Sequence, residues 1–272
     1  MSPRISIREV SKTYKSGDKT VYALERVSFD VDEGSFVSIV GPSGCGKSTL
    51  LKITSGLLPF TSGAVTIGGE PVSGPVDNVG MVFQSPVLLK WKTVMGNIML
   101  PVEFARLDPA KFHATALSLI HLVGLQGFEE MRPYELSGGM QQRVSLCRAL
   151  IMDPPILLMD EPFGALDAMT RDELDVELLK IWEQKRKTVI FVTHNIQEAV
   201  FLSDQIIVMS ARPGRVVRRL GIDLERPRTI ELMSSIRFGK YALEIRNALA
   251  SAGEETSSGG KVGPRPHKVE TR

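Results

Sequence analysis

The sequence contains few cysteines, no long apolar run and almost no excess of either charge. Its two cysteines, Cys45 and Cys147, match no metal-ligand pattern, so we expect two free thiols. No segment approaches the roughly 18 consecutive apolar residues that a membrane-spanning helix needs. The 33 Lys and Arg residues are balanced by 31 Asp and Glu residues, and a net charge of +2 predicts no nucleic-acid partner.

The remaining composition is that of a globular protein. The chain has 272 residues, of which 43% are hydrophobic and 24% charged, so disorder of the whole chain is excluded. Residues 1–8 lack the apolar core of a signal peptide. These features together predict a cytosolic, soluble protein but give no information about its chemistry.

Apolar runs alternate with helical segments along the chain, and no internal repeat is visible. This alternation predicts an α/β fold with a largely parallel sheet. Helices are expected at 49–58 and 143–152. Strands are expected at residues 5–10, 27–31, 36–40, 63–69, 79–83, 156–159, 188–192 and 205–210.

Two regions depart from this alternation. Residues from about 90 to 150 are predicted to be helical and to form a lobe inserted in the α/β core. Residues 229–250 are predicted to form an amphipathic helix, because four apolar residues share one face: Phe238, Tyr241, Ile245 and Leu249. Residues 251–272 are rich in Ser, Gly, Pro and charge, so we expect a disordered tail there.

The segment Gly41-Pro-Ser-Gly-Cys-Gly-Lys-Ser-Thr49 fits the pattern G-x-x-x-x-G-K-[ST] of phosphate-binding loops. It lies between an expected strand and an expected helix, which is the context that this loop requires. Glycines let the backbone fold around an anion, and the helix adds the positive end of its dipole. We therefore predict a nucleotide site at Gly41, Pro42, Ser43, Gly44, Cys45, Gly46, Lys47, Ser48 and Thr49, with Lys47 reaching the β- and γ-phosphates and Ser48 ligating Mg²⁺.

Two acidic residues, Asp160 and Glu161, end the apolar strand expected at 156–159. A carboxylate at the end of a buried strand beside a phosphate loop is typical of a Mg²⁺ ligand, and this role suits Asp160. Glu161 points to the opposite face and is placed to polarise an attacking water molecule. An ordinary solvated strand end is the alternative for both residues.

A second anion-binding helix start is predicted at Leu136-Ser-Gly-Gly-Met-Gln-Gln-Arg143. Ser137 is a good N-cap, and Gly138 and Gly139 leave backbone N–H groups uncovered. One nucleotide does not need two such helix starts from one chain. The second is therefore expected to serve a nucleotide held by another copy, although a simple capped helix is the alternative.

These motifs resemble those of the ATP-binding subunits of ABC transporters, and the 136–143 segment resembles the family signature. The resemblance covers about residues 3–220. It implies that residues 3–228 form one ABC-type P-loop ATPase core, with antiparallel N-terminal strands and an inserted helical lobe. It implies ATP and Mg²⁺ as cofactors. It also assigns further roles: Tyr14 stacks on adenine, Gln84 contacts Mg²⁺ and senses the transmembrane partner, Asp167 belongs to the D-loop that begins at Gly164, and His194 is the switch histidine at the γ-phosphate.

Several of these residues have alternatives. Tyr22 competes with Tyr14 for the adenine contact. Cys45 is either a small filler of the loop or a thiol whose modification would block ATP binding. Gln84 and His194, taken alone, would be ordinary structural residues.

Other segments resemble the importers of the nitrate, sulfonate and taurine type: Trp91-Lys-Thr-Val94 before Asn97, Ser210–Val216 and Leu224–Arg228. The resemblance implies a head-to-tail homodimer at the cytoplasmic face of the cell membrane. Its partners would be two transmembrane permease subunits and, indirectly, an extracytoplasmic solute-binding protein. The resemblance does not identify the transported solute. The alternative is a soluble ABC ATPase, such as one of iron–sulfur assembly.

The resemblance also implies a mechanism. Each ATP would lie between Gly41–Thr49 of one copy and Ser137–Gly139 of the other, with Glu161 positioning water and His194 stabilising the developing charge. Six arginines between Arg212 and Arg228 form a basic run, for which a lipid-facing surface and a solvated face are the alternatives.

Overall fold

The computed structural model of the chain describes residues 4–164 and 166–258. Its N-terminal part is an antiparallel sheet with the strand order β2-β1-β4-β5. The sheet confirms the predicted N-terminal strands, although β1 and β2 are longer than expected because they form one hairpin. Its strands are β1 (Ile5–Ser16), β2 (Lys19–Val31), β4 (Ser62–Ile67) and β5 (Glu70–Pro71).

The second sheet has six strands in the order β10-β9-β3-β8-β7-β6, and all its pairs are parallel except β10 with β9. The central strands β3, β7 and β8 are buried at every position, as their mostly apolar sequences favour, and their polar residues Ser38, Asp160 and Thr188 are buried with them. The strands are β3 (Phe36–Val40), β6 (Val79–Val82), β7 (Ile156–Asp160), β8 (Thr188–Val192), β9 (Gln205–Met209) and β10 (Val216–Gly221).

Alternation along the central strands divides the core into two clusters, one on each face of the parallel sheet. Phe36 and Val40 belong to the cluster beneath α6 (Ala168–Lys185) and α7 (Ile196–Leu202). Val37 and Ile39 belong to the other cluster, which contains α1 (Lys47–Thr54) and the antiparallel sheet. The parallel sheet is therefore the middle layer of the fold, with packed elements on both of its faces.

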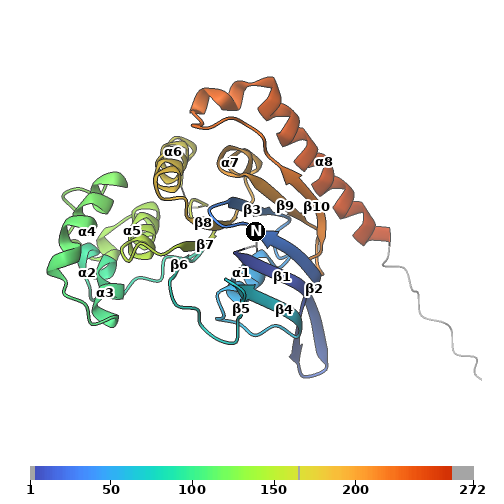
Figure 1. The fold of residues 1–272 in the computed structure, drawn as a ribbon, viewed down its shortest axis with the longest axis horizontal. Coiled ribbons are helices and arrows are strands. Elements are labelled where there is room, and N and C mark those ends of the chain that lie inside the picture. Colours follow the sequence, from blue (N-terminus) through green and yellow to red (C-terminus); the bar gives the residue numbers. More distant parts are fainter. Residues whose placement is uncertain (1–3, 165, 259–272) are drawn as a thin grey trace, which may run out of the picture.

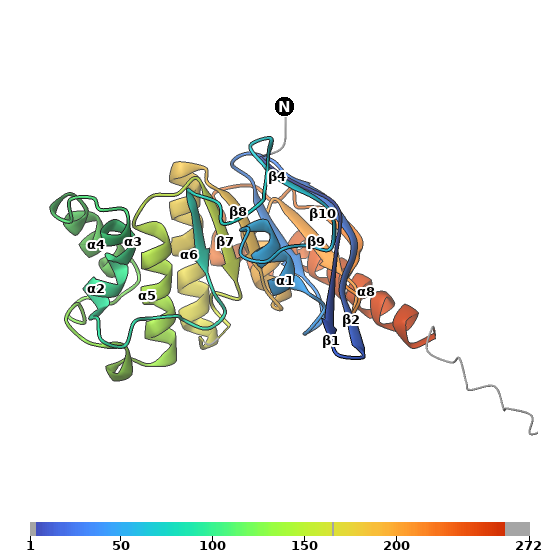
Figure 2. The same cartoon turned by 90° about the horizontal axis from the view of Figure 1, so that it is seen from below.

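Between β6 and β7 the chain forms helices, as expected for residues 90–150. They gather on one side of the molecule in both views (Figures 1 and 2), with α5 nearest the parallel sheet. These elements are α2 (Val94–Ile98), α3 (Leu100–Phe104), α4 (Ala110–Leu122), the 3₁₀ helix η1 (Pro133–Glu135) and α5 (Gly138–Leu150).

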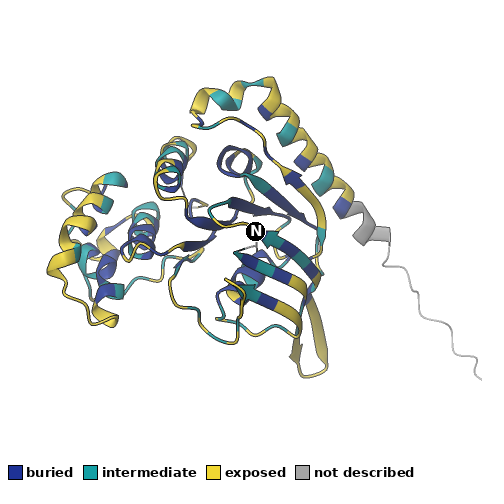
Figure 3. Ribbon diagram, in the orientation of Figure 1, coloured by how far each residue is buried: buried dark blue, intermediate teal, exposed yellow. Residues whose placement is uncertain are grey.

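The C-terminal segment differs from its prediction at both ends. A short 3₁₀ helix, η2 (Ile230–Ser234), comes first, and α8 then runs from Ile236 to Ser258. The expectation of a disordered tail from residue 251 is therefore wrong for residues 251–258, which continue the helix. Residues 259–272 lie outside the described residues. Figure 3 shows α8 with a buried and an exposed side, and Phe238 and Ile245 lie on the buried one. Among the described residues, no helix combines the length and apolarity needed to span a bilayer.

Candidate nucleotide-binding site

The predicted phosphate loop connects the end of β3 to the start of α1. Gly46 caps α1 with a φ of 103°, a left-handed conformation in which a side chain is strained. A Cβ atom at Gly46 would also lie 2.6 Å from Leu24 Cδ2 and 2.9 Å from the Ala23 oxygen. Glycine is thus required for the turn that points the first N–H groups of α1, which have no intrahelical acceptor, into the site.

Lys47 and Ser48 are already oriented by this loop. Lys47 is 5% exposed, and its Nζ donates hydrogen bonds to the Gly41 oxygen (2.8 Å) and the Pro42 oxygen (3.1 Å). Ser48 Oγ donates to Asp160 Oδ1 over 2.9 Å, and burial raises the pKa of Asp160. A hydroxyl and a buried carboxylate in contact are oxygen ligands of the kind that Mg²⁺ prefers, so these two residues fit the ion.

Two polar side chains converge on one carboxylate oxygen. Glu161 Oε2 accepts a hydrogen bond from Gln84 Nε2 over 3.2 Å and lies 3.1 Å from His194 Nδ1. These residues follow β6, β7 and β8, and the carboxyl ends of parallel strands meet at the same edge of a sheet. Glu161 has a φ of 46°, a strained conformation that its N–H stabilises by donating to the Val192 oxygen over 2.9 Å. The sequence prediction did not include this cluster's geometry, but each of its members was predicted.

A cavity of about 590 Å³ joins these groups to the phosphate loop. Its size is within the range of small-molecule sites. It is lined by Tyr14, Val21, Ala23, Ser43, Gly44, Gly46, Lys47, Ser48, Thr49, Gln84, Glu161, His194 and Arg212. The cavity thus unites most of the residues expected to bind nucleotide, while Gly41, Pro42 and Cys45 form the loop behind its surface.

The hairpin of β1 and β2 separates the two tyrosine alternatives. Tyr14 pairs with Val21, and both line the cavity, whereas Tyr22 is the next residue on β2 and does not. Successive side chains of a strand point to opposite faces, which explains the difference. The geometry favours Tyr14 as the residue beside a bound base.

The predicted second anion site lies apart from this cavity. Ser137 caps α5, and its Oγ accepts a hydrogen bond from the Met140 N–H over 3.2 Å. Ser137 and Gly138 are exposed, and a Cβ atom added at Gly138 would have no neighbour within 4 Å. Asp167 caps α6 by accepting from the Thr170 N–H, a hydrogen bond that lowers the pKa of Asp167. None of these residues lines the cavity of its own chain.

The structure favours one of the two alternatives for Cys45 and adds Arg212 to the residues that line the cavity. Cys45 is fully buried and burial raises the pKa of its thiol, which favours the filler role over that of a modifiable thiol. Arg212 lines the cavity, and its Nε and Nη2 donate to the Gly44 oxygen over 3.1 Å and 3.0 Å. The sequence patterns that include Arg212 did not place it at the nucleotide loop, because it reaches this loop from the turn between β9 and β10.

The other arginines of the basic run do not form one free surface. Arg215 pairs with Glu25, Arg218 pairs with Glu244, and Arg219 donates to the Ser28 oxygen. The last two members, Arg226 and Arg228, point inward. These contacts favour neither of the two surfaces expected for the run as a whole.

The fold and the loop define a nucleotide-binding protein of the P-loop class. The ABC transporter family model matches residues 24–164. The chain is 46% identical to an uncharacterized ABC transporter ATP-binding protein of Methanocaldococcus jannaschii, over 92% of each chain. It belongs to the ABC transporter family, as an ATP-binding subunit.

Two further relatives have more specific names. A taurine import ATP-binding protein of Rhizobium johnstonii is 48% identical over 86% of this chain and 91% of its own. An aliphatic sulfonates import ATP-binding protein of Bacillus thuringiensis subsp. konkukian is 46% identical over 82% of this chain and 88% of its own. These names do not favour the soluble, non-transport alternative.

A solved structure has the same fold. It is the dimeric post-hydrolysis state of an ATP-binding cassette bound to ADP and Pi. The two structures give a TM-score of 0.74 with 36% sequence identity, over 81% of this chain and 100% of that chain. The similarity confirms the predicted P-loop ATPase fold.

Proposed function

We propose that the chain hydrolyses ATP in a membrane importer of a small anion such as a sulfonate, taurine or nitrate. The observation that carries the proposal is the meeting of Glu161, Gln84 and His194 in one cavity with the phosphate loop. The solute class rests on the importer-like segments of the sequence and on relatives named for taurine and aliphatic sulfonate import.

The residues of the cavity supply binding and hydrolysis. Lys47 and the N–H groups at the start of α1 bind the phosphates, and Ser48, Asp160 and Gln84 hold Mg²⁺. Mg²⁺, when bound, neutralises phosphate charge. Glu161 orients the attacking water and accepts its proton.

Gln84 and His194 fix the carboxylate of Glu161 from two sides, so Glu161 is held in place before a nucleotide arrives. His194 then stabilises the charge that develops at the γ-phosphate. Tyr14, which lines the same cavity, packs against the base.

A second copy of the chain completes the site. Ser137 and Gly138 are exposed at the start of α5 and Gly139 is half-buried, and in a head-to-tail pair the N–H groups of this helix start contact the phosphate held by the partner. Asp167 lies at the same interface. Hydrolysis removes the charge that joins the two copies, which lets them separate.

The membrane partners are two permease subunits, supplied with solute by an extracytoplasmic binding protein. The chain acts at the cytoplasmic face of the membrane. Trp91 is 73% exposed and follows Gln84 by seven residues, so it is well placed as an anchor for a permease segment. Movement of Gln84 is thereby passed to the membrane subunits.

The test is Glu161→Gln in the purified protein, with the exposed residue Glu33→Gln as the matched control. The amide keeps the shape of the side chain but removes the proton acceptor. ATP binding should persist, the protein should form an ATP-dependent dimer by light scattering, and turnover should fall by about 10²–10⁴-fold.

Turnover at the wild-type rate would exclude Glu161 as the base. The import role is tested separately, by deleting the gene and measuring uptake of radiolabelled taurine, alkanesulfonates and nitrate. Unchanged uptake of all these anions in the deletion strain would contradict the proposed solute class.

A further inference from the structure

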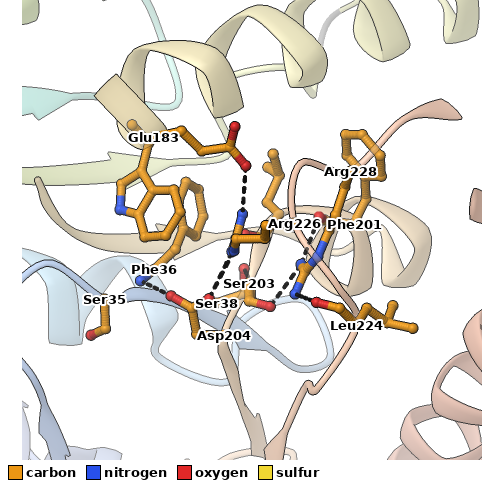
Figure 4. Close-up of polar contacts among 12 residues, drawn as sticks. Ser35, Phe36, Ser38, Glu183, Phe201, Ser203, Asp204, Leu224, Arg226 and Arg228 are labelled. Atoms are coloured by element: carbon orange, nitrogen blue, oxygen red, sulfur yellow. Dashed lines mark hydrogen bonds and ion pairs between the residues drawn. The ribbon is translucent and has the colours of Figure 1, made fainter. Parts of the chain in front are cut away.

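Two arginines of the basic run, Arg226 and Arg228, lie inside the protein near the C-terminal end of α7. Arg228 is 4% exposed, and burial lowers its pKa to about 10, so it stays charged at neutral pH. Figure 4 shows both guanidinium groups surrounded by side chains and main-chain oxygens. The nucleotide cavity does not include them.

Arg228 binds main-chain oxygens at the end of α7. Its Nη1 donates to the oxygens of Val200 (3.2 Å), Phe201 (2.8 Å) and Ser203 (2.9 Å), and its Nη2 to the Leu224 oxygen (3.3 Å). The last carbonyl groups of a helix have no intrahelical partner and carry the negative end of its dipole. A buried cation at this position donates hydrogen bonds to the free carbonyl oxygens and balances the negative end of the helix dipole.

Arg226 binds the same C-terminal end of α7. Its Nη2 donates to the Leu202 oxygen over 2.8 Å, so the two arginines together bind four consecutive carbonyls, from Val200 to Ser203. Its Nε and Nη2 also contact Asp204 Oδ1 over 3.1 Å and 2.8 Å. Its guanidinium carbon lies 4.1 Å from the ring centroid of Trp182.

His194 lies at the other end of α7. Asn195 caps the helix: its Oδ1 accepts from the N–H groups of Gln197 (2.9 Å) and Glu198 (3.3 Å). Thr193 Oγ1 bonds to Glu198 and accepts from the Asn195 N–H over 2.9 Å. His194 is therefore flanked by two residues that are tied to the first turn.

The helix between these ends has seven residues and a length of about 10 Å. It has fewer than two full turns, so loss of one turn leaves too little helix to persist alone. Fraying at the C-terminal end would therefore reach the turn that holds His194. A change at Arg228 can act on the site without touching it.

We propose that Arg228, supported by Arg226, is a positioning residue for His194, which it holds through α7. The inference rests on the role proposed above for His194. Under this proposal, the two inward-facing arginines of the basic run support the hydrolysis step. Residues 224–228 thereby help to hold the site in place.

The experiment uses Arg228→Lys and Arg228→Gln in the full chain. Lysine keeps the charge but cannot span all the carbonyls. We expect kcat to fall about tenfold while KM for ATP changes less than about twofold, because a small misplacement of a catalytic group affects turnover more than binding.

The second readout does not depend on activity. The chain has four histidines, so a spectrum of ¹³C-labelled histidine side chains is simple, and the His194 signal is assigned by its loss in His194→Ala. In Arg228→Lys the His194 signal should shift, while those of His113 and His121 on α4 should not. Arg226→Lys, which leaves the Arg228 contacts intact, should give a smaller shift and serves if Arg228→Gln does not fold.

Val65→Ala is the control for general destabilisation, because Val65 is a buried residue of β4 in the other core cluster. It should lower the melting temperature without moving the His194 signal. An unmoved His194 signal in Arg228→Lys, or a kcat no lower than that of Val65→Ala, would overturn the inference and leave the proposed function intact. Wild-type turnover in His194→Ala would instead overturn the proposed role of His194.

Discussion

Glu198, in the first turn of α7, should make the stability of the protein depend on pH. It is 4% exposed, and its Oε2 accepts a hydrogen bond from Thr193 Oγ1. Burial is the largest influence and raises the pKa of Glu198 from 4.5 to about 7. The Thr193 hydrogen bond and Arg171 lower this pKa, whereas Glu161 and Asp172 raise it.

The direction follows from the two pKa values. The pKa of Glu198 in the folded state lies above its unfolded value, so folding favours the neutral form. The contribution to stability is fully present below pH 4.5 and is lost as the pH rises through about 7. The difference between the two pKa values corresponds to about 3 kcal/mol of unfolding free energy. Asp175 on α6, whose pKa is also raised by burial and by Glu198, acts in the same direction.

Glu198→Gln removes the contribution of Glu198 together with its effect on the pKa of Asp175. The amide keeps the shape and can still accept the Thr193 hydrogen bond, but it does not ionise. Urea unfolding followed by tryptophan fluorescence should show the variant gaining roughly 2–3 kcal/mol relative to wild type between pH 5 and pH 8. The exposed control Glu33→Gln should follow the wild-type pH dependence. A constant difference between wild type and Glu198→Gln across this range would refute the reasoning.

Three further predictions concern the nucleotide cavity. Lys47→Ala should weaken binding of a fluorescent ATP analogue by tenfold or more, since a charge-assisted contact to phosphate is lost, and retained affinity would contradict its role. Tyr14→Ala should weaken the same binding by about three- to tenfold while Tyr22→Ala should not, and equal losses would exclude selective stacking by Tyr14. Cys45 should resist alkylation by iodoacetamide at pH 7.5 until urea unfolds the chain, as measured by mass spectrometry. Rapid labelling of the folded protein would contradict the burial of this thiol.

Local patterns predicted the fold and the phosphate loop because their causes are local. β3, the glycine-rich loop and Lys47 follow one another directly along the chain. A local sequence pattern is therefore enough to predict how they are arranged. The mostly apolar runs predicted β3, β7 and β8 with at most one residue of error, since strands covered on both faces are rich in apolar residues.

Other features depend on contacts between distant segments. Arg212 and Gly44 are separated by 168 residues, and only the turn after β9 brings them together. The direction of Arg226 and Arg228 was equally inaccessible, because a basic run looks the same whether it faces solvent or the end of a helix. The helix at 251–258 was missed since its composition resembles that of a tail, whereas the backbone continues the turns begun by α8.

The lobe that carries the predicted second anion-binding helix start is connected by hydrogen bonds to the loop that follows β6. Gln142 on α5 donates from Nε2 to the Phe83 oxygen over 2.9 Å, and Arg148 on the same helix donates to the Val87 oxygen. Gln84 lies between those two carbonyls and contacts Glu161. α5 therefore contacts the main chain on both sides of Gln84. We expect a displacement of Gln84 by a bound nucleotide to move the helix that begins at Ser137. The proposed head-to-tail pair requires such a connection, since each copy has to align Ser137 with its partner's nucleotide while holding its own.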